Sequence, residues 1–224
     1  MKWWSNNYHM LISSLPPLPT RFDGARLPIS HERLQDRLRM LEPEDADEMR
    51  RMLAVLRWSR QFEESDDAAV VRHYDALMRD ITIPLVREVL TVVLDVRMIT
   101  TALRRRRRGM GPPALGIGQW VEHIRRHFNQ PDFGLTHVYP RLSQLAPLFE
   151  RGDVLALYEG LTAGLWRYLK QRADEYLFSF EAVVLYVARW NMLAQWQQFD
   201  AERGRPIFDA LVTEALGEYA HVYS

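Results

Sequence analysis

The sequence predicts an all-α protein, a helical bundle around one long central helix. Apolar residues recur at helical spacing over most of the chain, and nothing after residue 14 alternates like a half-buried strand. Residues 84–108 are apolar on almost every side of a helix, which is typical of a helix wrapped by others. The 224 residues suffice for one good core or for two small helical lobes that share one.

Prolines and capping residues divide the N-terminal part. Residues 8–14 fit either a short strand or one apolar helical turn, and residues 15–19 are expected to be extended, because each proline disfavours helical backbone in the residue before it. Ser30 is a good cap for a short helix with its leucines on one face. Pro43 suits the first turn of the next helix, whose acidic start and basic end complement the helix dipole. Residues 65–67 indicate a break before another helix.

The central helix is predicted from about Pro84 to Arg108. Its apolar residues alternate in steps of four and three, the spacing of a coiled-coil-like seam. The seam residues are Leu85, Val89, Val92, Val96, Ile99 and Leu103.

A segment rich in glycine and proline, 109–118, follows the central helix and is expected to be a hinge. It divides the chain into an N-terminal helical lobe over 1–108, which includes the central helix, and a C-terminal helical lobe over 119–224. Asp153 and Ser179 are plausible helix caps in the second lobe. Helices are expected there over 119–128, 140–151, 154–176, 180–200 and 206–219.

Composition excludes several classes of function. Lys+Arg and Asp+Glu both number 29, and this zero net charge argues against a general polyanion binder. The chain has no cysteine, which excludes disulfides, thiolate zinc sites and a cysteine nucleophile. No segment has the pattern of a signal peptide or a membrane span, so a cytosolic location is expected.

The search for chemistry favours neither a catalytic site nor a cofactor. His123 and His127 are four apart on a predicted helix, the spacing that lets two imidazoles share a metal, but no third ligand is evident and a solvated face explains them. The segment 109–118 lacks a phosphate-binding pattern, and its two prolines remove backbone donors. We therefore expect no catalytic residue, no cofactor and no metal.

Five consecutive arginines, Arg104 to Arg108, end the central helix. The helix dipole accounts for two or three cations there. The others suggest an acidic partner, which could be a protein surface, RNA or a phospholipid headgroup, and the zero net charge favours a protein. The dense aromatic residues after 158 are expected mostly in the core, with some at an interface.

Several segments, in order, resemble a bacterial family of uncharacterised proteins that are encoded with V/A-type ATPase genes. That family is related to the C subunit of the enzyme, which is called the d subunit in eukaryotes. The matching segments are YHMLISSLPPLP near the start, LEPEDADEMRRML at 41–53, LDVRMITTALRRRR at 94–107, PDFGL at 131–135 and FSFEAVVLYVARWNMLAQWQQFDAERGRPIFDALV at 178–212.

The resemblance implies a non-catalytic structural protein with two lobes similar to part of the C subunit, which joins the central shaft of the rotor to the membrane ring during ion transport. Its partners would be central-stalk and membrane-ring subunits, and it would reach the membrane only through them, without a small-molecule substrate. The arginine run would supply an electrostatic contact and the turn near residue 180 a packing contact. The candidate partner-binding residues are Arg104, Arg105, Arg106, Arg107, Arg108, Ser179, Phe180 and Glu181.

Two other classes remain open. A helical adaptor or RNA-binding module could use the arginine run, and strong salt-dependent RNA affinity would favour it. A helical enzyme could use His123 and His127 as metal ligands, and zinc or iron bound to the pure protein would favour that class.

Overall fold

The computed structural model describes residues 8–22, 26–58 and 67–198, and these contain helices but no strand, which confirms the all-α prediction. The expected helix over 206–219 lies outside the described residues. The helices are α1 (His9–Ser14), α2 (His31–Leu38), α3 (Pro43–Trp58), α4 (Asp67–Arg79), α5 (Pro84–Arg107), α6 (Val121–Arg126), α7 (Leu142–Glu150), α8 (Val154–Ala173) and a further helix over 180–198.

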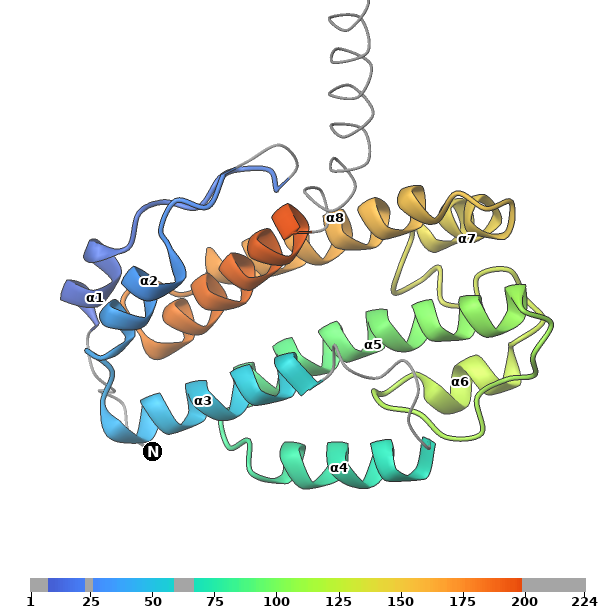
Figure 1. The fold of residues 1–224 in the computed structure, drawn as a ribbon, viewed down its shortest axis with the longest axis horizontal. Helices are drawn as coiled ribbons and strands as arrows, with labels where there is room; N and C mark the ends of the chain where they lie inside the picture. Colours follow the sequence, from blue (N-terminus) through green and yellow to red (C-terminus); the bar gives the residue numbers. More distant parts are fainter. Residues whose placement is uncertain (1–7, 23–25, 59–66, 199–224) are drawn as a thin grey trace, which may run out of the picture.

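Helix α5 runs through the middle of the molecule, with α3 and α4 on one side and α8 with the helix over 180–198 on the other (Figure 1). It contacts α3, α6, α7 and α8, and its buried residues run from Leu85 to Leu103. The prediction of a central helix wrapped by others is therefore confirmed.

The predicted seam is only partly correct. Val92 and Val96 are half-buried, whereas Leu94, Asp95 and Met98 are buried in their place. A seam with a 3.5-residue repeat requires supercoiling, but a straight helix has 3.6 residues per turn, so its buried face drifts along the sequence. Beyond the second turn, α5 presents the face of a straight helix to its neighbours.

The core has two main parts, and neither is continuous in the sequence. In the first, the first half of α5 packs with α1, α2, α3 and the helix over 180–198. In the second, the second half of α5 packs with α6, α7 and the start of α8. The glycine- and proline-rich segment at 109–118 therefore does not separate the two parts, because each part contains residues from both sides of it.

Most predicted boundaries and caps agree with the structure. Within residues 8–14, helix α1 covers His9–Ser14 and no strand is present, and residues 15–19 are non-helical, as predicted. Ser30 and Asp153 cap their helices by accepting from the backbone N–H groups of Arg33 and Ala156. The Ser179 hydroxyl is buried and has no hydrogen-bond partner among the described residues, so the side-chain cap expected there is not formed.

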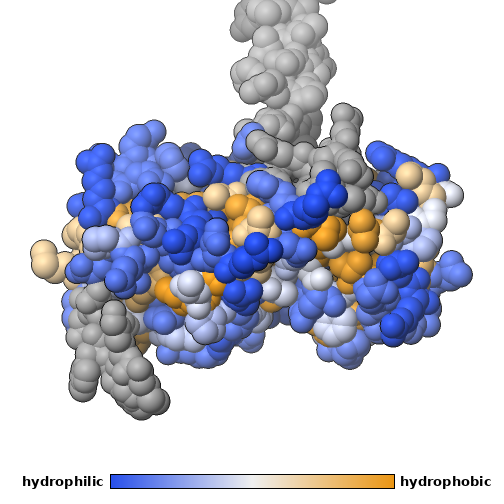
Figure 2. All heavy atoms as spheres, turned by 90° about the horizontal axis from the view of Figure 1, so that it is seen from below, coloured by the Kyte–Doolittle hydropathy of each residue, from blue (hydrophilic) through white to orange (hydrophobic). Residues whose placement is uncertain are grey.

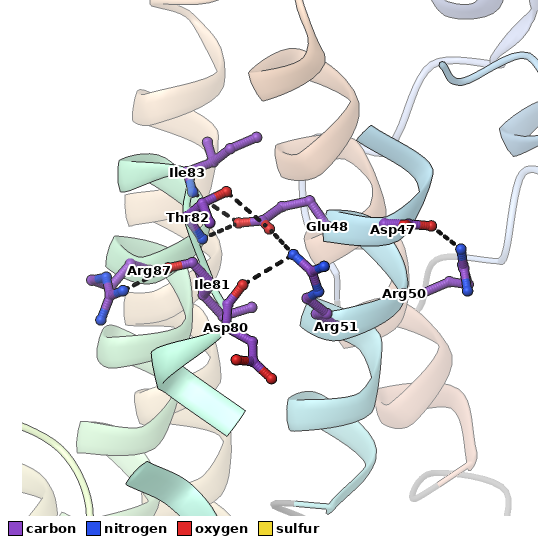
Figure 3. Close-up of polar contacts among 9 residues, drawn as sticks. All are labelled: Asp47, Glu48, Arg50, Arg51, Asp80, Ile81, Thr82, Ile83 and Arg87. Atoms are coloured by element: carbon purple, nitrogen blue, oxygen red, sulfur yellow. Dashed lines mark hydrogen bonds and ion pairs between the residues drawn. The ribbon is translucent and has the colours of Figure 1, made fainter. Parts of the chain in front are cut away.

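A buried carboxylate fixes the start of α5 to α3. Glu48 is only 2% exposed, and its Oε1 accepts from the backbone N–H groups of Thr82 and Ile83, both at 2.8 Å. Arg51, one turn further along α3, bonds both to Glu48 and to the carbonyl oxygen of Asp80 (Figure 3). The linker between α4 and α5 is therefore held by one acid and one base from α3.

The last described helix holds the N-terminal segment in place. The Tyr186 hydroxyl donates to the carbonyl oxygen of Pro16 at 2.9 Å, and the Trp190 indole N–H donates to that of Ile29 at 3.0 Å. On α8, the Trp166 indole N–H donates to the carbonyl oxygen of Thr20 at 3.0 Å. These bonds join residues more than 140 positions apart.

Candidate protein-binding surfaces

Arg106, the middle member of the arginine run, is bound within the protein. Its side chain is 18% exposed, and its Nε donates to Glu150 at 2.7 Å. Its Nη1 and Nη2 atoms donate to three backbone carbonyl oxygens of segment 128–131, and the guanidinium lies 4.7 Å from the centroid of the Phe133 ring. Arg106 therefore stabilises the fold and is poorly placed to contact a partner.

The other four arginines lie closer to solvent. Arg105 is half-buried, and its Nε donates to the carbonyl oxygen of Gly111 at 3.0 Å. Arg107 is exposed, with its guanidinium 5.4 Å from the centroid of the Phe149 ring. Arg104 and Arg108 are exposed as well. The candidate electrostatic surface thus consists of Arg104, Arg107 and Arg108, with Arg105 at its edge.

This surface lies at the end of the molecule formed by the C-terminus of α5 and by α6 and α7 (Figure 1). Seen from below, the same end is covered mainly by hydrophilic side chains, and apolar ones gather closer to the middle of that face (Figure 2). The exposed residues Arg125, Arg126 and Arg151 increase the positive charge there, whereas Glu122 and Glu150 offset part of it. We expect an acidic partner surface to be favoured at this end.

The turn after α8 carries the second candidate surface. Phe180 is buried, Ser179 and Glu181 are half-buried, and the exposed apolar residues come just before them. Leu177 is 74% exposed and Phe178 is 38% exposed. Of the three residues predicted here, Phe180 belongs to the core, so the candidate contact surface is centred on the exposed residues Leu177 and Phe178.

Helix α1 extends this apolar surface. The backbone N–H of Tyr8 donates to the carbonyl oxygen of Phe178 at 2.8 Å, and the centroids of the His9 and Phe178 rings lie 4.1 Å apart. Met10, on the same helix, is 81% exposed. We call Met10, Leu177 and Phe178 the apolar tip. Sequence reasoning missed it because the pairing of residue 8 with residue 178 is a tertiary contact.

A second buried carboxylate fixes the end of the glycine-rich segment to α5. Asp95 is fully buried, and its oxygens accept from the backbone N–H of Gln119 at 2.7 Å and from the Gln119 side-chain amide at 2.9 Å. Burial raises the pKa of Asp95 to about 6, although the hydrogen bonds from Gln119 act in the opposite direction. Gly118 has a φ of +96°, and a Cβ atom at that position would overlap the Asp95 carboxylate. The sequence feature that could have pointed to this site is the position of Asp95, an acid within the apolar stripe of the central helix.

The histidine pair lies in a small aromatic cluster. The His123 and His127 rings stack with centroids 4.2 Å apart, and the Trp120 ring meets both His123 and His137 edge to face. The Nδ1 atom of His127 is 2.9 Å from the carbonyl oxygen of His123. Among the described residues, no three His, Cys, Asp or Glu side chains are placed to hold a metal ion.

Within the described ranges, none of the helices combines the length and the apolar character that crossing a bilayer requires.

The fold and these surfaces define an all-helical protein with one central helix, a basic end and an exposed apolar tip. Residues 49–216, well over half of the chain, match the model of the family described as "Protein of unknown function (DUF2764)". The chain belongs to this family. No curated protein and no solved structure matches it.

Proposed function

We propose that this chain is a non-catalytic structural component that resembles the C subunit of V/A-type ATPases and couples the central rotor shaft to the membrane ring. It would be associated with the membrane only through its partner subunits. The observation that carries the proposal is the position of two candidate docking surfaces at opposite ends of the molecule, with the buried helix α5 in the body between them.

The basic surface lies at the C-terminus of α5, and the apolar tip lies beside α1 at the other end of the molecule (Figure 1). Between them α5 has 24 residues, about 36 Å at the rise of an α-helix, and it is packed against four other helices. A helix that is buried along its length resists bending because its side chains are close-packed with their neighbours. Such a body can transmit force between partners at its two ends.

The test is co-purification from cells that contain a V/A-type ATPase. The tagged wild-type chain should bring down shaft and ring subunits, and the double variant R104E/R108E should lose whichever of them contacts the basic end. Both arginines are exposed, so circular dichroism should remain unchanged. Arg106 is left intact because its loss would disturb the fold.

A matched control is R72E/R79E, which reverses two exposed charges on α4, a helix that packs against α3 and carries neither surface. It should co-purify like the wild type. The proposal is wrong if the wild-type chain brings down no rotor subunit, or if it instead binds RNA with an affinity that falls steeply with salt.

A further inference from the structure

A groove runs between the proline-containing segment after α1 and the helix over 180–198. It has a volume of about 220 Å³. One wall consists of Ile12, Leu15, Pro17 and Leu18, and the other contains Tyr186 and Arg189. The hydrogen bond from Tyr186 to the carbonyl oxygen of Pro16 connects the two walls, so the groove is part of the fold rather than a gap beside a loose segment.

Arg189 is the cation of this groove, and it has no anionic partner within the part of the chain that the structure describes. Its guanidinium lies 4.7 Å from the centroid of the Trp166 ring, and its Nε is buried without a hydrogen-bond acceptor among the same residues. Asp174 acts on it electrostatically, yet the two form no ion pair. Burial lowers the pKa of Arg189, so the charged form is held in surroundings that stabilise it poorly. A carboxylate placed here would relieve that cost through charge-assisted hydrogen bonds.

The walls restrict what can carry the carboxylate. Pro16 and Pro17 have no backbone N–H, so this edge can neither add a strand nor form a nest of N–H donors for a chain terminus. The groove therefore offers a ligand the Arg189 guanidinium as a hydrogen-bond donor, beside aliphatic side chains that are mostly half-buried. An acidic side chain between apolar neighbours satisfies both features.

We propose that this groove is a docking site for a partner protein, which inserts an Asp or Glu side chain toward Arg189 and packs the apolar residues on either side of that acid against Ile12, Leu15 and Leu18. The site is distinct from the basic end of α5 and from the apolar tip, and it does not depend on the partner being a rotor subunit.

The test is nuclear magnetic resonance titration of the full chain with two capped tripeptides. Acetyl-Leu-Glu-Leu-amide should shift the Arg189 Nε–H resonance and the resonances of Tyr186 and residues 12–18. Acetyl-Leu-Gln-Leu-amide, which has the same shape without the charge, should bind roughly tenfold or more weakly, because hydrogen bonds to a charged group are the stronger kind. This comparison changes only the ligand, so it does not rely on a variant that folds.

The matching protein variant is R189Q, with R167Q as its control, because Arg167 is an exposed arginine on the adjacent helix α8. R189Q should reduce the affinity for the glutamate peptide to that for the glutamine peptide, and R167Q should leave it unchanged. Equal binding of the two peptides, or no shift at residues 12–18 and 186–189, would overturn the proposal. It would also be overturned if hexanoate bound as tightly as the glutamate peptide, since the groove would then recognise a small carboxylate rather than a protein segment.

Discussion

Two buried carboxylates, Glu48 and Asp95, have the same structural role at different places in the fold. Each lies on a helix and accepts hydrogen bonds from the backbone of a loop. Glu48 on α3 binds the loop that follows α4, and Asp95 on α5 binds the loop that follows α5 itself. A buried N–H group without a hydrogen-bond acceptor is costly. Each carboxylate therefore takes the place of the water molecules that accept from these N–H groups in the unfolded chain. The sequence shows both acids but does not show which loops dock on them, because that depends on tertiary contacts.

The carboxyl group of Asp95 should make stability depend on pH. Its folded pKa of about 6 lies above the ordinary value of 3.8, so the folded protein binds this proton more tightly than the unfolded chain does. Stability from this group is therefore greatest below pH 4 and falls as the pH rises toward 6. Between about pH 5 and 7.5 the wild type should lose about 1 kcal/mol relative to D95N.

Urea unfolding of both proteins at the two pH values measures this difference, and the histidines cancel because they are common to both. An unchanged difference would show that Asp95 is not the titrating group.

Gly118 and Gly109 provide a matched pair of substitutions. Both have positive φ, but a Cβ atom at Gly118 would overlap the Asp95 carboxylate, whereas at Gly109 nothing lies within 4 Å. G109A should cost about 1 kcal/mol of unfolding free energy, the penalty of left-handed backbone alone. G118A should cost about 2 kcal/mol or more, because it also displaces the carboxylate from Gln119. Equal losses in thermal or urea unfolding would mean that the contact with Asp95 is unimportant.

At the scale of the element, α5 shows what a sequence pattern predicts well and what it does not. Its ends were predicted to within one residue, because Pro84 suits a first turn and Gly109 ends the arginine run. The buried face was predicted less well, because α5 has more apolar residues than one helix face can accommodate. Which valines remained half-exposed was decided by the neighbouring helices, and these are not visible in a local pattern.

The arginine run divides into different roles along the same helix. R106Q should lower the unfolding free energy by about 2–3 kcal/mol, because it leaves Glu150 and the carbonyl oxygens of segment 128–131 without their cation. R108Q removes an exposed arginine two residues further on and should change stability by less than about 0.5 kcal/mol. Urea denaturation distinguishes the two, and similar losses would show that Arg106 is not structural.

At the scale of the whole molecule, the sequence predicted the fold class and the order of helices, but not how distant segments meet. The apolar tip required the pairing of Tyr8 with Phe178, and the groove required Tyr186 to reach Pro16. In the basic surface, the run of five arginines was evident from the sequence, whereas the capture of Arg106 by a segment more than 20 residues away was not. The sequence pattern therefore predicts a surface only when all of its residues lie on one helix, as they do in the basic surface.

The hydrogen bonds that join Pro16 to Tyr186 and Ile29 to Trp190 also affect how the chain is made. During synthesis Pro16 and Ile29 leave the ribosome before Tyr186 and Trp190, so these two hydrogen bonds cannot form until the helix over 180–198 has emerged. Closing so large a loop delays the last step of folding. The carbonyl groups of Pro16 and Ile29 therefore stay without these partners until more than 160 further residues have been made.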